Sequence, residues 1–373
     1  MLLTAAALSA LIWLTVLVLP WRPWSTDERL PQDDGPAVPL DDVTALIPAR
    51  DEATCIAATL RALAAQGALA KIVLVDDQSS DGTGDVARAV GLANLEVLEG
   101  TPLPSGWSGK LWALNQASAR VDTPYTLLLD ADIELAPGTL AALFGHLRAN
   151  RLTLASVMAT LYMGSLWEKL LLPPFIYFFK MIYPFALSNR PGSRVAAAAG
   201  GCILVETAAL RDLGGFAALR EAIIDDCTLA SRVKARGGRT WLGLSHAVRA
   251  IRPYGSLASI WNMVARTAFT QLRYSTALLL VCTALLAVSY IAPVAGLVAG
   301  HGSERLYAAI AFAALTASYL PTIRYYRLHP LWALTLCPAA CLFLAMTWTS
   351  ARRYWAGERS RWKNRSYEAG GAG

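Results

Sequence analysis

The sequence predicts an α/β protein in which one domain with a mostly parallel sheet is flanked by transmembrane helices at both ends. Hydrophobic residues make up 55% of the 373 residues and charged residues only 16%, a balance that a soluble domain of ordinary composition does not reach. The apolar excess is gathered into long uncharged runs near the two ends of the chain. Between these runs, short β-branched segments alternate with segments of helical spacing, which predicts parallel strands joined by helices.

The long uncharged runs predict membrane helices. Four runs carry no charged residue: 2–20, 275–300, 306–323 and 331–350. Each is about as long as one bilayer crossing. The first therefore predicts an N-terminal membrane anchor (residues 1–20), and the others predict a C-terminal transmembrane region of about three segments (275–350), followed by a basic tail (351–373). A cleaved signal peptide is the alternative at the N-terminus, but no basic residue precedes the run and no small-x-small site precedes a plausible cut.

The middle of the chain predicts the folded domain. Residues 21–42 are rich in Pro and Asp and predict a linker, and residues 43–274 predict an α/β domain. Its strands are expected at residues 43–47, 71–75, 95–98 and 125–129, and its helices at residues 55–66 and 110–119. In such sheets, ligands bind at the carboxyl ends of the strands.

Pairs of carboxylates follow two of the predicted strands. Asp76 and Asp77 come directly after the second strand, where they can accept hydrogen bonds from a nucleobase and from ribose hydroxyls. A turn and helix N-cap is the alternative for this pair, since Asp, Ser and Gly favour both. Asp130 and Asp132 follow the fourth strand. They suit Mg²⁺ or Mn²⁺ shared with a diphosphate, because hard cations prefer oxygen ligands. A solvated turn is the alternative for this pair.

A lysine and a second acid pair complete the set of candidate residues. Lys110 can meet phosphate oxygens, although a lone surface lysine is the alternative. Asp225 and Asp226 open an amphipathic helix. Helix N-termini favour carboxylates, so capping explains one of these acids. A general base is the better explanation for the second acid.

Together these motifs resemble the inverting glycosyltransferase family 2, whose GT-A fold is a single Rossmann-like, nucleotide-binding α/β domain. The resemblance covers about residues 43–275 and depends on the order and spacing of its motifs. These motifs are Pro48 to Glu52, Asp76-Asp77 with Ser79 and Asp81, Gly109-Lys110 with Ala113 to Asn115, Asp130-Ala131-Asp132, Gly200-Gly201, Gly214 to Phe216, and Asp225-Asp226.

The resemblance implies a transfer of sugar from a nucleotide sugar, usually a UDP-sugar, with Mg²⁺ or Mn²⁺ as cofactor. It implies Asp226 as the catalytic base beside Asp225, Asp132 as the principal metal ligand beside Asp130, and Asp76 or Asp77 as the reader of the base. The nucleotide-sugar-binding residues would be Pro48, Arg50, Glu52, Asp76, Asp77, Lys110, Asn115 and Asp130. The acceptor-side residues would be Gly200, Gly201, Gln271 and Arg273.

Residues 107–115, 252–255 and 265–274 are similar to the hopene-associated glycosyltransferases of bacterial hopanoid gene clusters. This similarity implies a membrane lipid acceptor, with a hopanoid as one candidate, and a multi-pass protein of the bacterial inner membrane whose catalytic domain faces the cytoplasm. A processive polysaccharide synthase is an alternative. It would carry Gln-x-x-Arg-Trp where this chain has Gln271-Leu272-Arg273-Tyr274. A non-catalytic membrane scaffold is the other alternative.

The apolar, aromatic segment 166–187 is interrupted by charges, and Pro173, Pro174 and Pro184 are expected to break it. We expect a membrane-surface or acceptor-side element here, with a plain core helix as the alternative.

Other protein classes lack support in the sequence. It contains neither Gly-x-Gly-x-x-Gly after the first strand nor a P-loop, and its histidines and cysteines lack zinc-site spacing. The unpaired spacing of the six cysteines suggests a reducing compartment. The net charge is +6, but the basic residues lie beside apolar segments, so anionic lipid rather than nucleic acid is the expected partner.

The charges also raise a question of topology. Three crossings after a cytoplasmic domain would place Arg352 and Arg353 outside, against the positive-inside rule. We therefore expect one segment to be re-entrant, with Pro293 or Pro338 marking the break.

Overall fold

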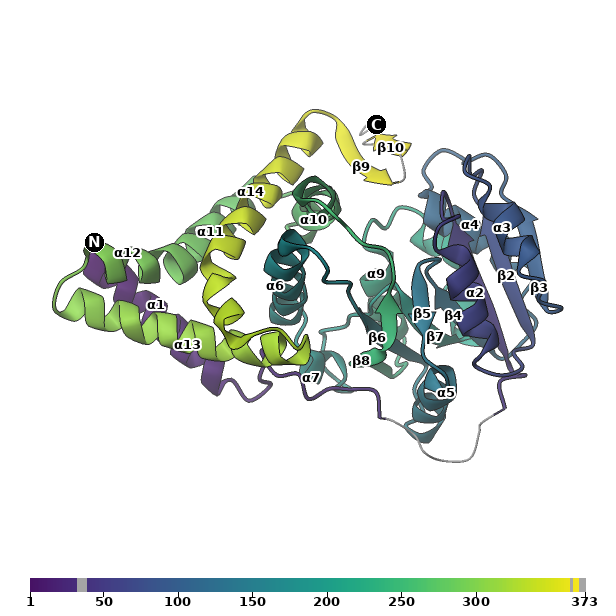
Figure 1. The fold of residues 1–373 in the computed structure, drawn as a ribbon, viewed down its shortest axis with the longest axis horizontal. Helices are drawn as coiled ribbons and strands as arrows, with labels where there is room; N and C mark the ends of the chain where they lie inside the picture. The colour runs from purple at the N-terminus through teal and green to yellow at the C-terminus, as the bar shows by residue number, and fades with distance from the viewer. Residues whose placement is uncertain (32–38, 363–364, 369–373) are drawn as a thin grey trace.

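The computed structural model describes residues 1–31, 39–362 and 365–368, and it places one large sheet beside a group of long apolar helices (Figure 1). The sheet has eight strands in the order β3-β2-β1-β4-β7-β6-β8-β5. The strands are β1 (Val43–Ala49), β2 (Lys71–Asp76), β3 (Leu95–Glu99), β4 (Tyr125–Leu129), β5 (Ile133–Leu135), β6 (Leu154–Thr160), β7 (Cys202–Glu206) and β8 (Thr240–Ala250). The four strands expected from the sequence are β1 to β4.

The sheet is mixed: most of its strand pairings are parallel, as expected, but it also contains antiparallel pairings. Strands β1, β2, β3 and β4 pair in parallel, and so do β6 and β8. Strand β7 runs antiparallel to both β4 and β6, and β5 runs antiparallel to β8. The chain leaves β6 and enters β7 at the same end of these two neighbouring strands, so β7 runs opposite to β6. The regular β-α alternation of the first half does not extend to this part of the sequence.

Helices cover both faces of the sheet. Helices α2 (Ile56–Ala64), α3 (Thr83–Ala89) and α5 (Thr139–Ala149) pack on one face, and α4 (Gly109–Ser118), α8 (Thr207–Asp212) and α9 (Asp225–Ala235) pack on the other. Every residue of β1 is buried, with Ala45 and Ile47 in one core and Leu46 in the other, because successive side chains of a strand point to opposite faces. Helices α2 and α4 are the two expected from the sequence.

The N-terminal segment is a helix followed by a segment that lies along β8. Helix α1 (Leu2–Val18) has 17 residues, which is at the lower limit of a bilayer crossing. Part of the predicted linker lies along β8: Leu30 N–H donates to Leu244 O over 2.9 Å, and Leu244 N–H donates to Glu28 O over 2.8 Å. Residues 32–38 of that linker lie outside the described part of the chain.

Segment 166–187 forms one long helix, α6 (Leu166–Ile182), and a short one, α7 (Phe185–Ser188). The expectation that Pro173 and Pro174 break the segment is wrong, since both lie inside α6. A Ser165–Glu168 capping box begins this helix, and both prolines are buried in it. We attribute the continuity to packing on several sides, which offsets the roughly 3 kcal/mol cost of an interior proline.

The C-terminal part is mostly helical. It contains α10 (Leu257–Gln271), α11 (Thr276–Leu286), α12 (Ala292–Ala299), α13 (Ser303–Tyr325) and α14 (Leu336–Trp355), followed by a hairpin of β9 (Glu358–Trp362) and β10 (Arg365–Glu368). Three helical stretches in the described residues are long and apolar enough to cross a membrane: Thr276–Ala299, Ser303–Tyr325 and Pro330–Trp355. They correspond to the three uncharged runs of the sequence. The Gly-Ala end of the predicted tail, residues 369–373, is outside the described part.

Candidate active site

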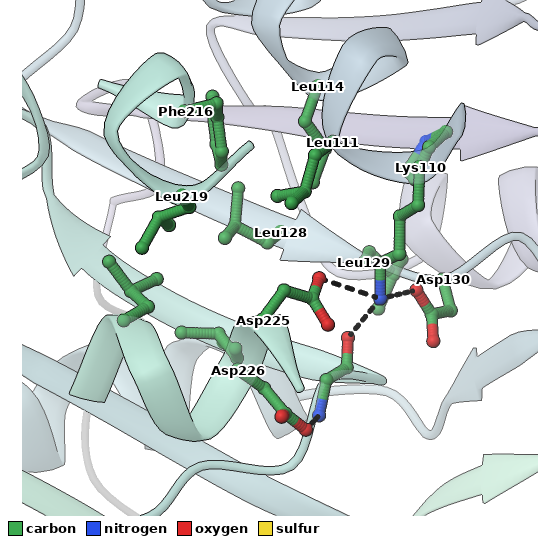
Figure 2. A pocket seen from close by; sticks show the side chains of 14 residues that line it. Lys110, Leu111, Leu114, Leu128, Leu129, Asp130, Phe216, Leu219, Asp225 and Asp226 are labelled. Carbon is green, nitrogen blue, oxygen red and sulfur yellow. Dashed lines mark hydrogen bonds and ion pairs between the residues drawn. The ribbon is translucent and has the colours of Figure 1, made fainter. Parts of the chain in front are cut away.

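The acids that follow β4 and those that open α9 meet around Lys110. Figure 2 shows the Lys110 side chain, which comes from α4, pointing between Asp130 and Asp225. Its Nζ lies 2.7 Å from Asp130 Oδ1 and 3.9 Å from Asp225 Oδ2, and it donates a hydrogen bond to Gly200 O over 3.4 Å. Burial alone would lower the pKa of Lys110, but Asp130 and Asp225 raise it above its usual value. Lys110 is therefore a permanent cation at this point, as phosphate binding requires.

Asp226 is held by backbone amides at the start of α9. Its Oδ2 accepts from Gly200 N–H over 2.8 Å, and its Oδ1 accepts from Cys227 N–H over 2.7 Å. Burial, followed by the neighbouring Asp225, raises the pKa of Asp226 to about 6. A carboxylate with a pKa near the working pH is well suited to take a proton from a hydroxyl.

Gly200 allows these groups to approach one another. A Cβ at this position would lie 3.2 Å from Asp226 Oδ2 and 3.3 Å from Lys110 Nζ. Such contacts are tighter than nine in ten real Cβ contacts, so a side chain here would press on both groups. Gly200 and Gly201, expected on the acceptor side, do line the cleft described below.

Asp132 forms part of a second charged group. Arg252 Nε lies 3.2 Å from Asp132 Oδ2, and the same guanidinium is in close contact with the carboxylate of Glu52. Burial and the charge of Asp132 raise the pKa of the neighbouring Tyr254 hydroxyl. Arg252 and Tyr254 lie in residues 252–255, which resemble the hopene-associated glycosyltransferases, but the sequence analysis gave neither residue a role. Because 120 residues separate Arg252 from Asp132, no local pattern could indicate their contact, and that resemblance was the only sign in the sequence.

Asp76 is the last residue of β2, and Asp77 follows it directly. Asp76 accepts from Ser79 N–H over 3.0 Å and from Gly84 N–H over 3.1 Å, as expected of a turn and helix-start acid. The side chain of Asp77 is fully buried, and Arg50 donates to the backbone oxygen of Asp77. Neither acid is among the residues that line the cleft. The role of the pair in base recognition stays a prediction.

One open cleft of about 1580 Å³ joins the charged groups to the apolar helices. Its floor includes Pro48, Glu52, Lys110, Asp130, Asp132, Asp225 and Asp226. From there it continues between α6, α10, α11 and α14, past side chains such as Phe178, Gln271, Leu285 and Phe343. Arg50, Asn115 and Arg273, also expected in the site, are not among the lining residues. Segment 166–187 therefore contributes one wall of the cleft and also packs within the protein.

Asp130 and Asp132 could provide two of the ligands of a divalent cation, with the remaining ligands supplied by the substrate and by water. In the described residues, no group of three or more His, Cys, Asp or Glu side chains could hold a metal ion. Both carboxylates nevertheless line the cleft, and both now face cations, Lys110 and Arg252. A metal bound through one or two carboxylates and substrate phosphates needs no larger protein cage.

Comparison with known proteins defines the class. Residues 44–214 match the model of Glycosyl transferase family 2, a range that contains Lys110, Asp130 and Asp132 and ends before Asp225. The chain carries a domain of this family, and it is a glycosyltransferase. No curated protein matches the sequence.

Solved structures show a similar fold. The mannosyltransferase PcManGT from Pyrobaculum calidifontis, in complex with GDP-Man and Mn²⁺, is 20% identical, with a TM-score of 0.54 over 95% of this chain and 98% of its own. TarS residues 1–349 from S. aureus, in complex with UDP-GlcNAc, is 14% identical, with a TM-score of 0.45 over 84% of this chain and 92% of its own. At 20% identity, the likeness to PcManGT shows the fold alone.

Proposed function

We propose that this glycosyltransferase moves a sugar from a nucleotide sugar, with inversion at the anomeric carbon, onto a hydroxyl of a membrane lipid. The observation that supports this proposal is the continuity of the cleft: charged residues line one end, and apolar helices line the other. A polar donor fits the first end and a hydrophobic acceptor fits the second. A hopanoid is the acceptor suggested by the resemblance of residues 107–115, 252–255 and 265–274.

The chemistry would take place where Asp226 faces the cleft. The acceptor oxygen would form a bond to the anomeric carbon while the bond from that carbon to the diphosphate oxygen breaks, so that a nucleoside diphosphate leaves. Asp226 would take the hydroxyl proton, a contribution of typically 10²–10⁴-fold in rate. Gly200 and Cys227 hold the carboxylate in place through their N–H groups.

The donor end would be neutralised by cations. Lys110 would meet phosphate oxygens, and Asp130 and Asp132 would hold Mg²⁺ or Mn²⁺. Such a metal supplies electrostatic stabilisation of the leaving diphosphate. The presence of Mn²⁺ with GDP-Man in the PcManGT structure supports this assignment. A UDP-sugar is the donor that the family resemblance suggests.

Transfer to lipid can be tested directly. The purified full-length protein is incubated in detergent with radiolabelled UDP- and GDP-sugars, Mn²⁺ and either a hopanoid polyol or a total bacterial lipid extract. We expect label in the organic phase with one donor, and mass spectrometry of the product identifies the acceptor. Label found only in water-soluble products would reject the lipid acceptor, and Asp226→Asn provides the background of the assay.

A further inference from the structure

The exposed apolar surface of the protein is confined to one side. Among the described residues, each large hydrophobic side chain that is exposed belongs to residues 1–18, to the region of α6, or to the chain from Leu278 to Trp355. Examples are Leu11 at 63% exposure and Val298 at 77%. The eight strands of the sheet and the helices α2, α3, α4, α5, α8 and α9 contribute none. A surface of this size and composition fits the hydrocarbon of a lipid bilayer.

Two long helical stretches lead away from the sheet and return to it. Figure 1 shows α11 and α12 running outward to an apex, where the N-terminus also lies, and α13 running back toward the sheet. The stretches contain 24 and 23 residues, or about 36 and 35 Å of helix, against about 30 Å of bilayer hydrocarbon. Near the apex, a Cβ on Gly296 would lie 2.6 Å from the Cβ of Ala308 and 3.8 Å from that of Ala6. Such close backbone contact through small residues is typical of packed membrane helices.

Helix α14 differs, because it packs along α6 and α10, the two helices beside the sheet domain. Tyr325, the last residue of α13, stacks on His246 of β8 with ring centroids 4.2 Å apart, so the chain has returned to the sheet before α14 begins. At the middle of α14, Phe343 contacts Phe178 of α6 with centroids 5.1 Å apart. Toward its end, Ser350 Oγ accepts from the N–H of Phe269 in α10 over 3.1 Å.

This placement conflicts with a crossing by α14. A helix that stood upright in the bilayer would bring the elements packed beside it, and the charged domain to which they belong, to the depth of the hydrocarbon. The desolvation cost of that arrangement is prohibitive. Figure 1 also shows the hairpin β9–β10, which follows α14, on the side of the sheet and not at the apex.

The charges at the ends of the helices agree with this arrangement. The loop at the apex and the start of α13 carry Glu304 and a single arginine, Arg305. The ends near the domain carry many more arginines: Arg22, Arg266, Arg273, Arg324, Arg327, Arg352 and Arg353. Arginine and lysine accumulate on the cytoplasmic side of membrane proteins.

We infer that α11–α12 and α13 cross the bilayer as a hairpin with the 300–302 loop on the far side, whereas α14 lies along the near surface and keeps the C-terminal hairpin beside the catalytic domain. This arrangement removes the conflict with the positive-inside rule that three crossings would create. It also lets the cleft wall formed by α10, α11 and α14 open into the near leaflet. The inference concerns the membrane alone and does not depend on the proposed lipid acceptor.

Cysteine labelling tests the arrangement. Asp85→Cys, Ser303→Cys and Ala356→Cys place a thiol at exposed positions in the sheet domain, at the apex and just after α14. Cells that produce each full-length variant are treated with a membrane-impermeant maleimide before and after permeabilisation, and the unsubstituted protein gives the background from its six native cysteines. We expect Ser303→Cys to react in intact cells, and the other two variants to react only after permeabilisation.

The other outcomes each overturn a part of the inference. Reaction of Ala356→Cys in intact cells, with Asp85→Cys protected, would show that α14 crosses. Protection of Ser303→Cys together with the other two would show that the hairpin does not reach the far side. Transferase activity of each variant in detergent shows that it is folded. The expected labelling in a protein that transfers no sugar to lipid would reject the proposed function and leave this inference standing.

Discussion

The two ends of the cleft are built on opposite principles. At the sheet end, nearly every charge faces an opposite charge: Lys110 faces Asp130 and Asp225, and Arg252 faces Asp132 and Glu52. At the helical end, the walls are mainly apolar and aromatic side chains from α6, α11 and α14. The sheet end is a preorganised electrostatic site, whereas the helical end provides apolar surface that a substrate can cover without directional hydrogen bonds.

This difference predicts how substitutions should divide. Buried charges act as a unit, since removal of one leaves its partner unpaired, so single changes at the sheet end should be severe. Apolar walls contribute roughly in proportion to the area they bury, so single changes at the helical end should be mild and should affect one substrate only. The following predictions test this division, from the largest expected effect to the smallest.

Asp132→Ala should have the largest effect. It removes a proposed metal ligand and also leaves Arg252 with only Glu52. We expect transfer to fall below detection and Mn²⁺-dependent binding of the nucleotide sugar to disappear in calorimetric titration. Asp122→Ala, at an exposed acid that does not line the cleft, is the control and should behave as the unsubstituted protein. Full activity of Asp132→Ala, or of the unsubstituted protein in excess chelator, would contradict the metal assignment.

Asp226→Asn should follow. Asparagine keeps the shape of the side chain and can still accept one of the two N–H bonds, but it cannot take a proton. Turnover should fall by about 10²–10⁴-fold, with donor affinity nearly unchanged, while Asp225→Asn should cost less. Donor titration and a turnover assay on each variant separate the two roles. If Asp225→Asn were dead and Asp226→Asn active, the two assignments would have to be exchanged; loss of donor binding in both would make the pair structural.

The pH dependence should show the same base. Burial and Asp225 raise the pKa of Asp226 to about 6, so the ionised base is present above that pH and is lost as the pH falls. We expect kcat/KM to decrease about tenfold per pH unit below about 6. Asp225→Asn removes a repelling charge, so the acid limb should move to lower pH. An acid limb at the same pH in both proteins would show that Asp225 does not act on the base.

The sequence predicted the sheet end better than the helical end, for a physical reason. Acids directly after buried strands, such as Asp130 after β4, are local signals, and the parallel register of β1 to β4 brings strand ends together. The antiparallel entry of β7 depends on where the chain returns after α6, which no local pattern specifies. Tertiary packing decides two further features. One is the contact of Arg252 with Asp132 and Glu52. The other is the continuation of α6 across Pro173 and Pro174. The continuity of the cleft depends on the docking of α10, α11 and α14, whose apolar sequences specify length but not neighbours.

A matched pair of substitutions on α11 should give the smallest effect. Leu285 and Leu280 are exposed to the same extent, 55% and 56%, but only Leu285 lines the cleft. Asparagine at either position should be equally unfavourable in the membrane, so a difference between the two variants reports on the cleft. Leu285→Asn should lose about 1 kcal/mol of apolar contact with a lipid acceptor. We therefore expect KM for the lipid to rise about fivefold, while KM for the nucleotide sugar stays unchanged, and we expect neither constant to move in Leu280→Asn. Equal effects of the two substitutions on the lipid KM would mean that the acceptor does not occupy the helical end, and a change in the donor KM of Leu285→Asn would mean that the two ends of the cleft are not independent.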